Sequence, residues 1–298
     1  MKKVLIYVFV ILFLGCQNSS DNPEKKVIQK LVSGYVQAGE SQLFYNMQGE
    51  GKPLIMIHGG LLNMSMWDSQ WREFAQKYKL IRYDAKGHGQ SKNLDKSFSH
   101  HEDLYQLINS LKLDKPVIMG LSMGGHVAID FALKYPDIAS ALILVSPGLT
   151  GFVFDSKELK NYQDKLVKAA MAGDKRGVIE YFQRSWTDGP YRIPRDVDPV
   201  VREKVRAMIE ETYTNWNDNS VENKLSPEAI NRLKEINIPV LVITGSLDLP
   251  DIHKIAELLK KDVKGLQHIE IPGVAHMVNM ENPQMFNKIV HDFMQKLK

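Results

Sequence analysis

Apolar and polar positions along this chain form blocks that predict short buried strands separated by longer amphipathic helices. Mostly apolar runs predict strands at 54–57, 80–83, 117–120, 141–145 and 240–244, and residues 266–271 predict a further strand. A strand without a polar side is typical of a sheet that helices cover on both faces. Helical periodicity fills 66–77, 104–111 and 123–135. This alternation predicts a mostly parallel central sheet flanked by helices, an α/β fold.

The alternation is interrupted once. Residues 34–38 and 43–49 predict an opening hairpin, but after Pro147-Gly148 no strand pattern follows until Val240. The intervening segments 156–172, 175–186 and 199–215 have helical periodicity. We therefore predict an α/β core in two parts, 34–147 and 236–298, with residues 148–235 inserted as a helical cap.

The pentapeptide Gly120-Leu-Ser-Met-Gly124 lies between a predicted strand and a predicted helix. A GxSxG sequence in that setting is typical of a sharp turn that exposes the serine, and glycines flank it because the strained backbone leaves no room for side chains. Ser122 is therefore the candidate nucleophile. A serine hydroxyl needs a base to remove its proton and donors to stabilise the oxyanion that it generates.

Residues for these two tasks follow other predicted strands. Asp248 follows the strand at 240–244, and His276 lies in the loop after 266–271. Histidine can take the serine proton near neutral pH, and a carboxylate can orient its ring. Asp251 is a competing acid, but it lies beside Pro250, where it is expected to cap the following helix.

The run His58-Gly59-Gly60 ends another predicted strand. A glycine-rich loop at this place can supply a backbone N–H to an oxyanion hole, here that of Gly60. The second donor is expected to be the N–H of Met123.

The order Ser122, Asp248, His276, together with Gly87-His-Gly-Gln-Ser91, resembles the α/β-hydrolase family, and within it the esterase and perhydrolase-like branch. The resemblance implies a Ser-His-Asp triad that works through an acyl-enzyme, most simply in a carboxylesterase. Serine in place of aspartate at position 122 argues against haloalkane dehalogenases and epoxide hydrolases. The alternatives left open are a hydrolase of lactones or thioesters, a cofactor-free perhydrolase, a carbon–carbon bond hydrolase, and a hydrolase-like binding module without activity.

The remaining histidines and the large apolar residues have structural alternatives. Packing, capping or turn formation is the expected role of His58, Asp84, His88, His100, His101 and His126. Candidates for an apolar pocket lining are Met64, Met66, Trp67, Phe152, Phe154, Trp186 and Trp216. Their abundance favours an acyl or aromatic ester over a highly charged substrate.

The first residues resemble a bacterial lipoprotein leader. Lys2 and Lys3 precede an apolar run that ends in Gly15-Cys16, as in a secretory signal peptide. We expect residues 1–15 to be a signal peptide, Cys16 to be lipidated and 16–33 to be a tether. The protein would then be exported across the inner membrane and anchored in a lipid bilayer of the cell envelope. The alternative is that Cys16 belongs to a cleaved leader without lipid.

Composition narrows the choice of partners. The net charge is +3 and Cys16 is the only cysteine, so a cysteine nucleophile within the core is excluded. Lysines are scattered among acids, which indicates solvated helix faces rather than a nucleic-acid partner. No metal-ligand cluster or phosphate-binding loop is evident in the sequence, and we therefore expect neither a metal nor a cofactor. The sequence does not indicate an oligomeric state.

Overall fold

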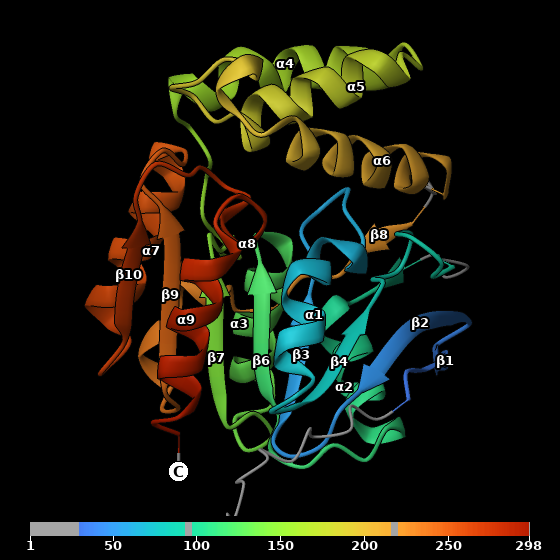
Figure 1. Ribbon diagram of the computed structural model, residues 1–298, viewed down its shortest axis with the longest axis vertical. Helices are drawn as coiled ribbons and strands as arrows, with labels where there is room; N and C mark the ends of the chain where they lie inside the picture. Colours follow the sequence, from blue (N-terminus) through green and yellow to red (C-terminus); the bar gives the residue numbers. More distant parts are fainter. Residues whose placement is uncertain (1–29, 93–96, 216–219, 298) are drawn as a thin grey trace, which may run out of the picture.

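The computed structural model describes residues 30–92, 97–215 and 220–297. Its centre is an eight-stranded sheet of order β1-β2-β4-β3-β6-β7-β9-β10 (Figure 1). The strands are β1 Val32–Ala38, β2 Ser41–Gln48, β3 Pro53–Ile57, β4 Lys79–Tyr83, β6 Val117–Leu121, β7 Ala141–Val145, β9 Val240–Gly245 and β10 Gln267–Ile271. Pairings β1–β2 and β2–β4 are antiparallel and the other five are parallel. The predicted α/β fold class is confirmed.

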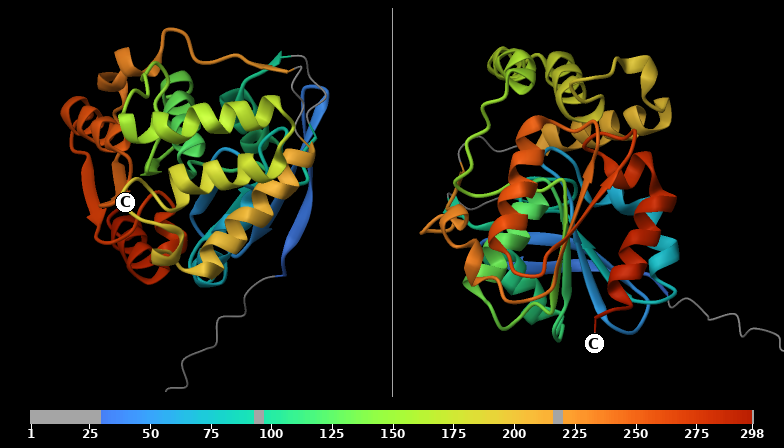
Figure 2. Two further views of the ribbon diagram at one scale, coloured as in Figure 1. Left: turned by 90° about the horizontal axis from the view of Figure 1, so that it is seen from above. Right: turned by 90° about the vertical axis from the view of Figure 1, so that its left-hand side faces the viewer.

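Helices cover both faces of this sheet (Figure 2). One face carries α2 His100–Ser110, α3 Met123–Lys134 and α7 Pro250–Asp262, and the other carries α1 Asp68–Phe74 and α9 Pro283–Met294. In β3, Ile55 and Ile57 pack into the hydrophobic core under α2, α3 and α7, whereas Leu54 and Met56 pack into the core under α1 and α9. Burial on both faces explains why the central strands are continuous apolar runs.

Three helices from the middle of the chain lie together beyond the carboxyl ends of the parallel strands (Figure 1). They are α4 Lys157–Met171, α5 Lys175–Phe182 and α6 Pro199–Asn215. The predicted helix 175–186 is not a single α-helix, because a π-helical turn, η2 Gln183–Thr187, follows α5. We refer to residues 156–215 as the cap helices.

Several short elements complete the described chain. A two-stranded sheet pairs β5 Ser97–Phe98 with β8 Val221–Glu222. The short helices are η1 Met64–Trp67, η3 Pro194–Asp196, η4 Ala229–Asn231, η5 Leu233–Glu235 and α8 Val278–Glu281.

Within the described ranges, no helix is both long and apolar enough to cross a membrane. The predicted leader and Cys16 lie outside the described residues.

Candidate active site

The turn between β6 and α3 holds Ser122 in a sparsely populated conformation, with φ 54° and ψ −109°. Such an outlier costs about 1–3 kcal/mol and persists only where its surroundings impose it. The N–H of Ser122 donates to the carbonyl of Val145 at 3.0 Å, and its carbonyl accepts from the N–H of Gly148 at 2.9 Å. The turn is therefore fixed to β7 and to the loop that follows it.

The glycines beside Ser122 are required by close backbone contacts. A Cβ at Gly120 would lie 2.1 Å from the carbonyl oxygen of Gly124, and one at Gly124 would lie 2.4 Å from that of Ile57. Neither neighbour is a flexible side chain. Glycine at both positions thus allows β3, β6 and α3 to pack this closely around the turn that the GxSxG pattern predicts.

Asp248 and His276, from the loops after β9 and β10, form a buried pair. Nδ1 of His276 lies 3.0 Å from Oδ2 of Asp248, and the two residues are 2% and 1% exposed. Oδ1 of Asp248 also accepts from the N–H of Leu249 at 2.8 Å. Because an ionised carboxylate only accepts, Nδ1 carries the hydrogen and Nε2 is left as an acceptor.

Nε2 of His276 is buried and has no hydrogen-bond partner among the described residues. Ser122 and His276 line the same cavity, although no hydrogen bond joins their side chains within the described part of the chain. Catalytic hydrogen bonds of this kind often tighten only when substrate binds. The ring is therefore oriented as a base, with its accepting nitrogen unoccupied.

Gly60 and Met123, the two predicted oxyanion donors, lie close together and line the same cavity. A Cβ at Gly60 would lie 3.9 Å from Cβ of Met123. The neighbouring amides are occupied, since Gly59 donates to Sδ of Met66 at 3.4 Å and Leu61 donates to Nε2 of His88 at 3.3 Å. Among the described residues, neither Gly60 nor Met123 uses its N–H in a hydrogen bond, so both are available to an oxyanion.

Buried polar side chains hold the loop that carries Gly60. His58 Nδ1 donates to the carbonyl of Gly59 at 2.8 Å, and Nε2 accepts from the N–H of Ala85 at 2.9 Å. Burial lowers the pKa of His58 to about 4, so its ring is neutral near pH 7. Asp84 accepts from the backbone of Met64 at 2.8 Å. These contacts give His58 and Asp84 the structural roles expected from the sequence.

Asp251 does not cap its own helix, and the expectation that it would is wrong. The N-cap of α7 is Leu249 and no side chain bonds there. Asp251 instead accepts from the N–H groups of Asp155 and Ser156 at 3.2 and 3.3 Å. Its carboxylate therefore holds the chain that leads into α4, and Asp248 alone of the two contacts His276.

A cavity of about 270 Å³ lies between the core and the cap helices. Ser122, His276 and the Gly60 loop line its core side. The cap side is lined by Leu159, Gln163 and Leu166 of α4, Phe182 of α5, and Ser185 and Trp186 of η2. The ring of Trp186 lies 4.5 Å from that of His276, centroid to centroid. Apolar side chains thus surround the reactive groups.

Of the predicted lining residues that the structure describes, only Trp186 lines this cavity. Met66 and Trp67 are buried in the core, and Met64 is buried beside them. Phe152 and Phe154 pack against the core on the other face of the sheet, and Phe154 also contacts Trp186 from behind the cavity wall. Trp216 lies outside the described residues. Residues 159, 163 and 166 were missed, although their i, i+4, i+7 spacing marks one helix face; that spacing does not say whether the face meets a core or a cavity.

In the part of the chain that the structure describes, no cluster of three or more His, Cys, Asp or Glu side chains could hold a metal ion.

Comparison with known proteins agrees with the fold. The model of the alpha/beta hydrolase fold family matches residues 52–283. The chain belongs to this family. It is 27% identical over 266 residues to a Bacillus subtilis (strain 168) protein provisionally named a 2-succinyl-6-hydroxy-2,4-cyclohexadiene-1-carboxylate synthase, covering 82% of this chain and 90% of that protein.

A second relative is the pimeloyl-[acyl-carrier protein] methyl ester esterase of Yersinia enterocolitica, 25% identical over 262 residues, 86% of this α/β hydrolase and 98% of that protein. Among solved structures, the enol-lactonase from Burkholderia xenovorans LB400 superposes with a TM-score of 0.73 at 22% identity, covering 88% of this chain and all of the other. This α/β hydrolase is accordingly an enzyme of the hydrolase class with esterase-like relatives.

Proposed function

We propose that this hydrolase cleaves a carboxylic ester through an acyl-enzyme, with Ser122 as nucleophile, His276 as base and Asp248 as orienting acid. The observation that carries the proposal is the buried His276–Asp248 pair, whose remaining ring nitrogen has no partner among the described residues and whose histidine shares a cavity with Ser122.

The reaction follows from these positions. Oγ of Ser122 attacks the ester carbonyl while Nε2 of His276 takes its proton, and Asp248 stabilises the imidazolium. The N–H groups of Gly60 and Met123 stabilise the oxyanion; losing one such donor typically costs about 3–4 kcal/mol of transition-state stabilisation. His276 then protonates the leaving alcohol, and water releases the acid by the reverse sequence.

The apolar side chains of α4, α5 and η2 favour a small-molecule substrate with an apolar acyl group. A relative named as a methyl ester esterase supports ester chemistry.

A panel of p-nitrophenyl esters tests this proposal. The purified protein should hydrolyse acetate to hexanoate esters with higher kcat/KM than the succinate monoester, and Ser122→Ala should remove the activity. Preference for the charged ester would overturn the assignment of the acyl group. Activity that appears only with hydrogen peroxide would indicate a perhydrolase instead.

We also propose that lipid on Cys16 anchors the enzyme to the cell envelope, with residues 16–33 as tether. Support comes from the leader-like pattern Lys2-Lys3, apolar run, Gly15-Cys16. Metabolic labelling with an alkyne fatty acid in a bacterial host should mark the wild type and not Cys16→Ser. Equal labelling of the two proteins, or none in an exported wild type, would reject the anchor.

A further inference from the structure

The cap chain just after η2 packs against both loops that carry the acid and the base. Gly189 has φ +73°, and a Cβ there would lie 2.8 Å from the carbonyl oxygen of Leu247 and 2.9 Å from Cβ of Ala275. Leu247 immediately precedes Asp248, and Ala275 immediately precedes His276. The N–H of Leu247 also donates to the carbonyl of Val274 at 2.9 Å. The acid loop, the base loop and the cap therefore meet at one point.

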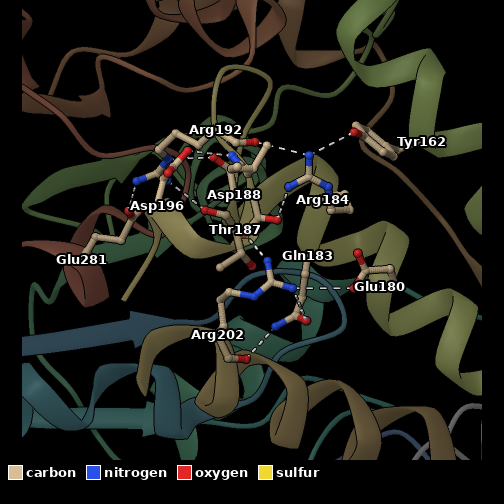
Figure 3. A network of polar contacts seen from close by, with 11 residues as sticks. Tyr162, Glu180, Gln183, Arg184, Thr187, Asp188, Arg192, Asp196, Arg202 and Glu281 are labelled. Carbon is tan, nitrogen blue, oxygen red and sulfur yellow. Dashed lines mark hydrogen bonds and ion pairs between the residues drawn. The ribbon is translucent and has the colours of Figure 1, made fainter. Parts of the chain in front are cut away.

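An ion pair near this point links the cap to the base loop through Glu281 of α8 (Figure 3). Nη1 of Arg192 lies 2.5 Å from Oε2 of Glu281, and the other oxygen of Glu281 accepts from the N–H of Ala275 at 3.0 Å. Arg192 also donates to the carbonyls of Asp188 and Thr187, at 2.8 and 2.9 Å. A continuous set of polar contacts thus runs from the cap to the residue before His276.

The cap end of this bridge is held firmly. Asp188 is fully buried and pairs with Arg184 at 2.5 Å and with Arg202 of α6 (Figure 3). Arg202 also donates to the side chain of Gln183. Because the backbone carbonyl of Asp188 accepts a hydrogen bond from Arg192, this buried network fixes where the Arg192 guanidinium lies.

At the other end of this bridge, the buried carboxylate of Glu281 depends on the Arg192 guanidinium. The side chains of Arg192 and Glu281 are only 10% and 6% exposed. Burial raises the pKa of Glu281 above its ordinary value, although its hydrogen bond and ion pair with Arg192 oppose the rise. Removing one partner of a buried pair leaves the other charge uncompensated. Neither residue lines the cavity, so substrate does not supply the missing contact.

We propose that Arg192 and Glu281 are positioning residues that hold the base loop, residues 272–277, against the cap, so that His276 stays aligned with Asp248 and Ser122. This inference rests on the proposed triad. The cap then has two separable tasks, since α4 and α5 line the acyl pocket while the Arg192–Glu281 bridge sets the base.

The test compares Arg192→Met, Glu281→Ala and the double variant with a matched control, Arg232→Met. Arg232 makes the same kinds of contact far from the site, to a carboxylate of Glu235 at 2.7 Å and to the carbonyl of Leu133 at 3.1 Å. We expect kcat on p-nitrophenyl butyrate to fall about tenfold to a hundredfold in Arg192→Met and Glu281→Ala, with KM changed less than about threefold.

Further results separate positioning from general damage. The kcat of the double variant should be no lower than that of the less active single variant, because each substitution removes the same ion pair. Arg192→Lys retains a cation and should recover part of the kcat that Arg192→Met loses. Hydrogen exchange of a peptic peptide covering 272–280 should accelerate in Arg192→Met, although that substitution is in the cap. Thermal unfolding shows whether each variant is folded. If Arg192→Met does not fold, Arg192→Lys replaces it in the kinetic and exchange measurements.

The inference is overturned if kcat of Arg192→Met stays within about twofold of that of Arg232→Met. It is also overturned if exchange of the 272–280 peptide is unchanged, or if KM rises while kcat does not. Failure of the triad itself would appear differently. A folded wild type would then show no reactive serine, while the exchange comparison would still report whether Arg192 holds the base loop.

Discussion

Asp248 and Asp251 are almost equally buried, at 1% and 0% exposure, yet they have different partners. Asp248 accepts a hydrogen bond from Nδ1 of His276, whereas Asp251 accepts from the backbone N–H groups of Asp155 and Ser156. A carboxylate that accepts from Nδ1 fixes the tautomer in which Nε2 can take a proton. A carboxylate that accepts from backbone amides fixes the chain. Sequence position alone leaves both residues as possible acids.

Asp248→Asn should therefore lower kcat/KM on an ester by about 10³–10⁴, since an amide can donate to Nδ1 and favour the wrong tautomer. In Asp251→Asn the amide oxygen can still accept from the backbone N–H groups, so kcat/KM should fall by less than about tenfold. Steady-state kinetics of both variants at pH 7.5 measures the difference. A larger loss in Asp251→Asn would reassign the orienting acid.

The structure brings together the residues at positions 60, 122, 123, 248 and 276 that the sequence singled out. This was possible because each follows a strand, and the carboxyl ends of parallel strands meet at one edge of a sheet. Bulk alone misled the choice of lining residues: Trp67 is fully buried in the core. Glu281 was not singled out because its partners, Arg192 and the N–H of Ala275, are fixed only by the tertiary structure.

Helix α4 shows how one element divides between pocket and solvent. Leu159 and Leu166 face the cavity, whereas Val167, the next residue after Leu166, is 47% exposed. The apolar face of such a helix is predictable from its period. What covers that face is not, because a core and a substrate pocket select the same kinds of side chain.

Leu166→Trp should place an indole in the cavity of about 270 Å³ and shorten the acyl chain that fits. We expect KM for p-nitrophenyl hexanoate to rise about tenfold and KM for the acetate to change less than threefold. Val167→Trp, on the outer face, should leave both values near those of the wild type. Equal effects of the two substitutions would mean that α4 does not contact the acyl group.

Element boundaries depart from the predictions where tertiary contacts override local pattern. Helix α2 begins at His100 rather than at the predicted Leu104. The sequence pattern missed the first turn because its buried residues His100, His101 and Asp103 are polar. The π-helical turn after Phe182 places the ring of Trp186 against that of His276 in a tilted arrangement. Local periodicity contains no information about either contact.

At the scale of the whole molecule, three of the buried histidines in its described part are neutral near pH 7, because burial lowers the pKa of each. Burial lowers the pKa of His58 to about 4, and that of His88 and His100 to about 3. In the unfolded chain each would titrate near ~6.5. Between pH 6.5 and about 4 the unfolded state therefore binds more protons, so stability falls as pH falls. Asp84 acts in the opposite direction, because burial raises its pKa to about 6, and the raised pKa values of Asp130 and Glu281 act with it. Burial also lowers the pKa of His101, His268 and His291, which adds to the effect of the first three histidines.

The free energy of unfolding should accordingly decrease from pH 7 to pH 4.5, by up to about 1.4 kcal/mol per pH unit for each of these histidines below pH 6.5. Urea denaturation at constant ionic strength measures it. His100→Gln should flatten the slope, because one titrating group is removed. A free energy of unfolding that is constant or rises toward pH 4.5 would contradict the burial of these rings in their neutral form.

At the scale of the chain, the α/β architecture was predictable because the central strands are short, mostly apolar runs and the helices between them are periodic. The pairing of β5 with β8 was not, since two-residue strands have no period. The central claim nevertheless concerns one hydroxyl group, and labelling with a fluorophosphonate tests it most directly.

Intact-mass and peptide analysis should show one adduct on the wild type, on Ser122. None should appear on Ser122→Ala, and formation should be at least about a hundredfold slower in His276→Ala. A folded wild type that does not react, or an adduct that persists in Ser122→Ala, would contradict the assignment of Ser122 as a nucleophile activated by His276.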